Sequence, residues 1–186
     1  NQDATTAYTV GVACGEFHTI LLKRDGSVVA RGWNIVGQLD VPPGLTDAIA
    51  IACGSDHSLA LRNDGTVVAW GYQDTGLTEV PAGLNQVVAV ACGAFHNLAL
   101  KSDGTVVAWG WNYSGQLGDG TNANKNSPIQ IGTAINWQSI ETGGGYTLAI
   151  KTDGNLWAWG QNFDGQLGDG TTVDKNSPTE ITPCPV

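Results

Sequence analysis

Three histidines occupy matching places along the chain, and they are the first residues whose chemistry needs an explanation. His18, His57 and His96 each stand three residues after a Cys-Gly pair, and a fourth copy of the pattern has Tyr146 there. Imidazole nitrogens bind zinc, but zinc requires ligands that converge on one ion, whereas equivalent positions of a repeat spread apart in space. Tyr keeps a hydrogen-bonding ring at the fourth place. We therefore expect one buried, hydrogen-bonded ring in each copy and no metal site.

Three cysteines recur in the same pattern, and a fourth lies outside it. Cys14, Cys53 and Cys92 end short apolar runs, and Thr142 replaces them in the fourth copy. This exchange favours small buried side chains over reactive thiols. Whether sulfur atoms of neighbouring copies pair as disulfides is left open, because pairing depends on geometry that spacing does not give. Cys184, in the segment TPCPV, is a candidate for an intermolecular disulfide.

The sequence contains no singular set of residues that would form an active site. Nucleophilic catalysis needs one Ser or Cys, one base and one orienting acid, and not residues that recur identically in every copy. The glycine-rich segments match neither the G-x-x-x-x-G-K-[ST] nor the G-x-G-x-x-G phosphate-binding motif. We expect a non-enzymatic protein with no catalytic residues and no cofactor. A pair of carboxylates brought together from different copies stays open.

Aromatic residues flank a repeated glycine in each copy. The position before it holds Trp70, Trp109 and Trp159, with Arg31 in the first copy, and we expect these tryptophans to fill the space between copies. After the glycine, where a strand would leave its sheet, aromatic and amide residues follow. Such a row should line one rim, where these groups suit protein recognition, although packing of the loop base is the alternative. The candidate binding residues are Trp33, Tyr72, Trp111, Asn34, Asn112 and Asn162.

Two acidic loops resemble calcium-binding segments in composition. The strings GDGTNANKN and GDGTTVDKN carry Asp119 and Asp169 among several amide oxygens. They lack the D-x-[DN]-x-[DN]-G spacing and the final bidentate Glu of a calcium loop, and turns stabilised by Asn and Asp side chains explain the same residues. Calcium in the loops 118–126 and 168–176 is left open.

The whole chain is a repeat, which determines how these residues must be positioned. The strings VACGEFHTILLKRDGSVVARG, IACGSDHSLALRNDGTVVAWG and VACGAFHNLALKSDGTVVAWG are copies of one unit, and ETGGGYTLAIKTDGNLWAWG is a fourth. The Asp-Gly pairs begin at Asp25, Asp64, Asp103 and Asp153, in steps of 39, 39 and 50 residues. We attribute the longer step to one inserted loop. The units are expected at 8–46, 47–85, 86–135 and 136–186, the last with a C-terminal tail, after a polar leader at 1–7.

Each unit predicts a small antiparallel sheet. Two β-rich runs flank the Asp-Gly pair, where Gly supplies the positive φ that tight hairpins require. The preceding apolar runs, such as AIAIACG, predict a strand buried on both faces, and no segment has a sustained helical period. We therefore expect an all-β protein: a β-propeller of about four antiparallel blades, partial or completed by self-association.

The pattern A-C-G-x-x-H-x-L-A-L-x-x-D-G-x-V-x-x-W-G-x-N-x-x-G-Q-L resembles the repeat of the regulator of chromosome condensation family over nearly the whole chain. The segments DVPPGL and EVPAGL are also similar, more weakly, to repeats of secreted propeller-type β-lactamase inhibitors. The first resemblance implies a ring of seven blades, whereas this chain has four units. An open arc would expose apolar faces, so we expect a fragment, a small four-bladed ring, or docking onto another copy.

Composition narrows the classes of partner. The 8 Lys and Arg residues against 17 Asp and Glu give a net charge of −9, which opposes binding to nucleic acids and anionic membranes. No apolar run approaches the length of a membrane-spanning helix. The chain begins with NQDATTA and contains no Met, which is typical of a mature secreted protein whose signal has been removed. We expect an extracellular or cell-surface location.

Three functional hypotheses follow. The first is a non-enzymatic structural scaffold that assembles with copies of itself through its terminal blades, as a ring or a filament. The second is a protein-binding module or enzyme inhibitor that uses the aromatic rim. The third, implied by the family resemblance, is a guanine-nucleotide exchange factor, which the acidic composition and the small number of units disfavour.

Overall fold

The computed structural model describes residues 8–181, which form four antiparallel sheets in sequence order. Blade 1 consists of β1 (Thr9–Cys14), β2 (His18–Lys23) and β3 (Val28–Gly32). Blade 2 consists of β4 (Ala48–Cys53), β5 (His57–Arg62) and β6 (Val67–Gly71), followed by the short 3₁₀ turn η1 (Asp74–Gly76). Blade 3 consists of β7 (Val87–Cys92), β8 (His96–Lys101), β9 (Val106–Gly110) and β10 (Lys125–Gln130). Blade 4 consists of β11 (Trp137–Thr142), β12 (Tyr146–Lys151), β13 (Leu156–Gly160) and β14 (Lys175–Ile181).

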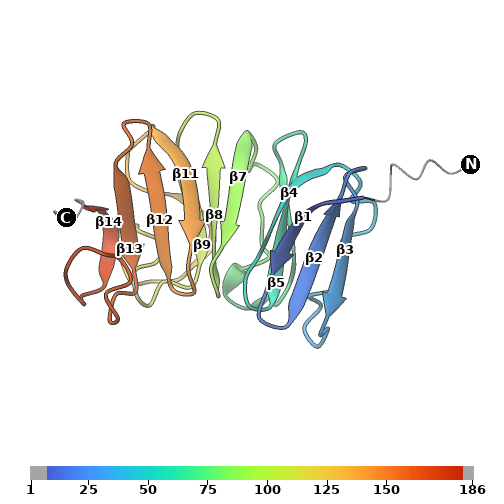
Figure 1. Cartoon of the computed structure of the whole chain (residues 1–186), viewed down its shortest axis with the longest axis horizontal. Helices are drawn as coiled ribbons and strands as arrows, with labels where there is room; N and C mark the ends of the chain where they lie inside the picture. Colours follow the sequence, from blue (N-terminus) through green and yellow to red (C-terminus); the bar gives the residue numbers. More distant parts are fainter. Residues whose placement is uncertain (1–7, 182–186) are drawn as a thin grey trace, which may run out of the picture.

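The four blades stand side by side, from β1–β3 at one end of the molecule to β11–β14 at the other (Figure 1). The innermost strand of each blade contacts that of the next, in the order β1, β4, β7 and β11. The predicted all-β propeller of four antiparallel blades is thus confirmed, and its form is an open arc and not a closed four-bladed ring. No helix within residues 8–181 has the length and apolar character needed to cross a lipid bilayer.

The two longer units each contain a fourth, outermost strand. The attribution of the longer step to a loop alone was therefore wrong in part, because β10 and β14 follow the loop and pair with β9 and β13. Pro128 and Pro178 lie within these strands. Proline is tolerated there because an edge strand leaves one row of its backbone groups without a ladder partner.

Asp-Gly turns close the hairpins between the second and third strands, as predicted. Gly26 has a φ of 79°, a left-handed conformation that favours glycine. Asp25 Oδ1 accepts hydrogen bonds from the Ser27 hydroxyl at 2.7 Å and the Ser27 amide at 3.0 Å. These bonds, led by that of the hydroxyl, hold the pKa of the Asp25 carboxyl below its usual value. The same arrangement recurs at Asp64 and Asp103.

The innermost strands β4 and β7 are only partly buried, although the sequence predicted burial on both faces, and in each of them a bulge exposes one side chain. The pairing of β4 with β5 shifts register between Ala48 and Ala50, so Ile49 is the unpaired extra residue. Its side chain is exposed, as is that of Val88 at the equivalent bulge of β7. Their exposure therefore arises from the bulge and occurs within the internal blades of the arc.

Three apolar clusters fill the interfaces between successive blades. Between blades 2 and 3, for example, Leu59, Leu61 and Val67 of blade 2 pack with Ala99 and Trp109 of blade 3. We call the face that a blade turns to the preceding blade its leading face, and the opposite face its trailing face. Trp109 lies on a leading face and is fully buried, so the predicted placement of this tryptophan position between blades is confirmed.

Candidate functional site

In every blade, the turn between the first and second strands and the residues that follow the third strand lie on the same side of the arc. The amide of Trp33 donates to the Phe17 carbonyl at 2.9 Å, and this bond recurs in the other three blades. It places the predicted row beside the turns near the inner edge of the arc. We call this surface the rim, and its row consists of Trp33, Tyr72, Trp111 and Gln161.

Aromatic pairs make the rim more apolar than the row alone indicated. The rings of Phe17 and Trp33 meet edge to face at 5.2 Å, and Phe95 stacks on Trp111 at 4.6 Å. Tyr113 adds an edge contact with Trp111 at 5.5 Å and is 68% exposed. Sequence reasoning missed the two phenylalanines and Tyr113. The available signal was an aromatic residue directly before the histidine in two of the four copies.

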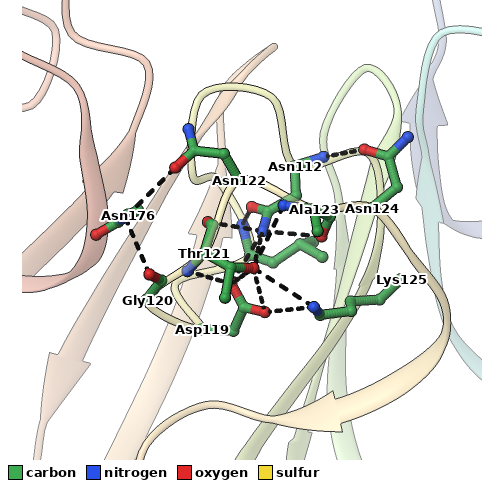
Figure 2. A network of polar contacts seen from close by, with 10 residues as sticks. Asn112, Asp119, Gly120, Thr121, Asn122, Ala123, Asn124, Lys125 and Asn176 are labelled. Atoms are coloured by element: carbon green, nitrogen blue, oxygen red, sulfur yellow. Dashed lines mark hydrogen bonds and ion pairs between the residues drawn. The ribbon is translucent and has the colours of Figure 1, made fainter.

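Asn112 is fully buried and holds the long loop of blade 3 in place (Figure 2). Its Nδ2 donates to Asp119 Oδ1 at 2.9 Å and to two loop carbonyls. Asn162 makes the equivalent bonds in blade 4. Asn34 is exposed and donates to Asp40 Oδ1 at 2.9 Å. The asparagines thus shape the rim loops, and Asn112 and Asn162 do so from beneath the surface.

The carboxylate of each long loop already has a cationic partner. Lys125 Nζ lies 2.9 Å from Asp119 Oδ2 (Figure 2), and Lys175 Nζ lies 3.2 Å from Asp169 Oδ2. Hydrogen bonds from Thr171, above all, lower the pKa of Asp169 to about 2. A lysine ammonium therefore balances the charge that calcium would balance. Across residues 8–181, no group of three or more His, Cys, Asp or Glu side chains is placed to hold a metal ion.

The repeated histidines link successive blades. The Nε2 contacts are His18 to Ser58 Oγ at 2.8 Å, His57 to Asn97 Oδ1 at 2.8 Å, and His96 to Thr147 Oγ1 at 3.1 Å. Each partner lies in the next blade and directly follows the residue equivalent to the histidine, because Ser58 follows His57, Asn97 follows His96 and Thr147 follows Tyr146. Burial lowers the pKa of His57 to about 4 and that of His96 to about 3, so both rings are neutral at pH 7. The predicted buried, hydrogen-bonded ring is confirmed for the three histidines, each of which also joins two blades. The prediction of one such ring in every copy is wrong for blade 4, where Tyr146 is only half-buried.

Protein-family models match the chain in the same four repeat units. A family model of the regulator of chromosome condensation (RCC1) repeat matches residues 10–38, 48–76, 87–116 and 137–166, and a second model of this repeat matches 103–150 and 153–186. The chain belongs to the RCC1-repeat family. A search of curated proteins found no match.

Solved structures of RCC1-like propellers share this architecture. The chain superposes on human WBSCR16 with a TM-score of 0.83 at 26% identity, over 98% of this chain and 55% of that one. For Prp20p from Saccharomyces cerevisiae the TM-score is 0.84 at 22% identity, over 97% of this chain and 52% of that one. The chain therefore spans about half the length of these structures.

The cysteines of the RCC1 repeats border a pocket at the inner edge of the arc. Cys14, Cys53 and Cys92 and the turns after them line a space of about 260 Å³, and all three are free thiols. Burial raises the pKa of Cys53 to about 11 and raises that of Cys92 as well, so both thiols are protonated and poorly reactive. Cys14 was expected to be buried and is exposed, because no blade within residues 8–181 packs against the leading face of blade 1. Cys184 and the leader 1–7 lie outside the described residues.

Proposed function

We propose that this RCC1-repeat chain is a non-enzymatic, extracellular protein scaffold that associates with copies of itself through its terminal blades. The observation that carries the proposal is the exposure of the two end faces. Val12 on the leading face of blade 1 is 65% exposed, whereas its equivalent in blade 4, Ile140, is 5% exposed. Ile150 and Leu156 on the trailing face of blade 4 are 39% and 36% exposed. Their equivalents in blade 3 are buried inside an interface.

The trailing face of blade 4 is also hollowed, like a surface that packs against a neighbouring blade. A hollow of about 130 Å³ is lined by Leu148, Ile150 and Leu156 together with Glu141. Burying a Leu or Ile side chain contributes about 1.5–3 kcal/mol, so covering both faces favours association. The extracellular location is supported by composition alone, through the excess of Asp and Glu over Lys and Arg and the low content of Lys and Arg.

Sedimentation of the purified chain over a wide concentration range tests this function. We expect species heavier than the 19.3 kDa chain whose population grows with concentration. Leu156→Lys should shift the population toward monomer, because a charge would enter the buried contact. The matched control is Ile135→Lys, an equally drastic change at a 69% exposed side chain away from both end faces. A wild-type chain that stays monomeric at every concentration would contradict the proposal.

A second candidate function, recognition of another protein by the rim, is favoured by its aromatic residues, of which Phe17 is 47% and Trp33 51% exposed. Interface aromatics in packed clusters commonly contribute 2 kcal/mol or more. Replacing Trp33, Tyr72 and Trp111 together by Ala should weaken binding of a captured partner by more than about 30-fold while self-association persists. Tyr8→Ala, at an exposed aromatic outside the rim, is the control. Unchanged affinity in titration calorimetry with the triple variant would exclude the rim as the binding surface.

An exchange-factor role is a lesser proposal. Prp20p has binding properties to Gsp1p and histones, and yeast RCC1 (Prp20) has been crystallised with Kap60. The chain matches about half of Prp20p, and its net charge of −9 opposes contact with DNA. For these two reasons nucleotide exchange is a less favoured function than self-association as a scaffold or protein binding by the rim.

A further inference from the structure

We infer that the rim of blades 1 to 3 binds a segment of another protein that is rich in lysine and arginine, and that the cationic side chains of this segment enter two acidic hollows between the blades. The inference rests on the proposed recognition of a partner by the rim, and it specifies the chemistry of that partner. Both hollows lie at interfaces inside the arc, one between blades 1 and 2 and the other between blades 2 and 3.

The first hollow opens where the loop after β3 meets blade 2. Its volume is about 260 Å³, and it is lined by Val36 and Asp40 of that loop together with Gln73 and Thr78 of the loop after β6. Asp40 is exposed, and it is the only charged residue in the lining. Its Oδ1 accepts a hydrogen bond from Asn34 Nδ2 at 2.9 Å, which orients the carboxylate. The hollow therefore offers a single negative charge beside the rim.

The second hollow repeats the first hollow one blade further along the arc. Its volume is about 390 Å³, and it is lined by Thr78, Glu79 and Pro81 of blade 2 together with Asn126 and Ser127 of blade 3. Glu79 occupies the repeat position of Asp40, because 37–42 reads GQLDVP and 76–81 reads GLTEVP. Glu79 is exposed and is again the only charged residue in the lining. The two shorter units thus place equivalent carboxylates at successive interfaces.

The chain supplies no cation of its own to these hollows. Arg62 is the only Lys or Arg between residues 32 and 100, and it lies at the end of blade 2 opposite the rim, where it pairs with Asp47 at 3.6 Å. Lys125 precedes the blade 3 residues of the second hollow, but its Nζ lies 2.9 Å from Asp119 Oδ2 (Figure 2). Within residues 8–181 the carboxylates of both hollows therefore form no ion pair.

An aromatic surface in a negative field connects the two hollows. Tyr72 leads into the loop that runs from the first hollow to the second, and its hydroxyl donates to Asp74 Oδ2 at 3.1 Å. This bond above all, together with the charges of Asp74 and Asp56, raises the pKa of Tyr72. The turn η1, which contains Asp74, contacts β9 and β10 of blade 3, and β9 leads directly to Trp111, on which Phe95 stacks. The aromatic rings of blades 2 and 3 therefore adjoin unpaired carboxylates.

These features favour a cationic polypeptide segment over other occupants. Guanidinium and ammonium groups bind carboxylates, and they also bind the faces of aromatic rings, so one side chain type suits both the hollows and the rings. The phosphates of a nucleic acid would be repelled by the same carboxylates. Because the hollows lie on successive interfaces, one occupant reaches both only if it runs along the rim and carries at least two basic residues.

A fluorescein-labelled hexa-arginine peptide and the full chain test the inference by fluorescence anisotropy. We expect the peptide to bind, to bind more weakly as salt is added, and a hexa-glutamate peptide not to bind. The double variant Asp40→Asn and Glu79→Gln removes both charges at exposed sites while keeping their shape, and it should weaken binding about tenfold. The matched control is Asp153→Asn and Glu180→Gln, which removes the same charge at exposed sites of blade 4 and should change affinity less than about twofold.

The outcomes separate this inference from recognition by the rim. If the two double variants weaken peptide binding equally, net charge and not the hollows attracts the peptide, and the inference is wrong. Absence of binding to wild-type chain at low salt also overturns it. A captured partner that is lost in the triple rim variant but retained by Asp40→Asn and Glu79→Gln would leave rim recognition standing without a basic partner. A partner retained by both variants would overturn rim recognition itself.

Discussion

Lowering the pH from 7 to 4 is expected to reduce the free energy of unfolding by roughly 6 kcal/mol through His57 and His96. Burial lowers the folded-state pKa of His57 to about 4 and that of His96 to about 3, below the ordinary value of 6.5. The neutral rings stabilise the fold fully above pH 6.5. As the pH falls below that value, the unfolded chain binds protons that the folded chain does not, so stability is lost down to pH 4 and below.

Denaturant titrations at pH 7, 5.5 and 4 measure this effect. This loss is a large part of the total stability of about 5–15 kcal/mol that is typical of proteins, so partial unfolding at pH 4 is expected. The double variant His57→Gln and His96→Gln keeps a hydrogen-bonding group at both interfaces and removes the titration. Its stability should be lower at pH 7 and should change much less between pH 7 and pH 4 than that of the wild type. Wild-type stability that changes by less than about 1 kcal/mol between pH 7 and pH 4 would contradict neutral, buried histidines.

Trp109→Ala is expected to cost about 3–5 kcal/mol of stability. Trp109 is fully buried between blades 2 and 3, where it packs against Leu59 and Val67. Its removal leaves a cavity at the interface and takes one of two donors from the Leu77 carbonyl, which keeps Asn97 Nδ2 at 2.9 Å. The lost contacts join two blades, so the damage should extend to both.

The matched control for Trp109→Ala is Trp33→Ala, the same change at a side chain that is 51% exposed. It should cost less than about 1 kcal/mol, because little packing is lost at the rim. Thermal and denaturant unfolding of both variants gives the comparison. Hydrogen exchange should show faster amide exchange in β5 and β8 of Trp109→Ala. Equal stability of the two variants would show that the interface between blades 2 and 3 does not stabilise the arc.

The repeat allowed much of the architecture to be predicted from sequence. A residue type that recurs at one position must satisfy the same surroundings in each blade, which is why the histidines could be predicted to be buried and hydrogen-bonded and the tryptophans to lie between blades. The same reasoning placed Asp-Gly at hairpins. Cys14 was misjudged because burial at its position depends on a preceding blade, and within residues 8–181 no blade packs against the leading face of blade 1.

The outer strands and the depth of the asparagines were harder to predict. Lys125–Gln130 lacks the alternation of a strand and contains proline, and it is extended because β9 offers a free edge. Asn112 has the sequence position of a rim residue but is covered by the loop that folds back to Asp119. Its burial depends on tertiary structure that local sequence does not encode. Trp33, Tyr72 and Trp111 lie along one rim, and their role in binding stays a prediction.

The recurring contacts between blades bear on how such a protein grows. Each trailing face receives the next leading face through equivalent bonds, from Glu16 to Ser55 and from Ser55 to Ala94. Because these contacts are equivalent, one blade can take the place of another. An in-frame duplication of the segment that encodes a blade therefore adds a blade without requiring changes in its neighbours. Gene duplication could in this way change the circumference of a propeller in a single step, and later mutation would need to adapt only the rim.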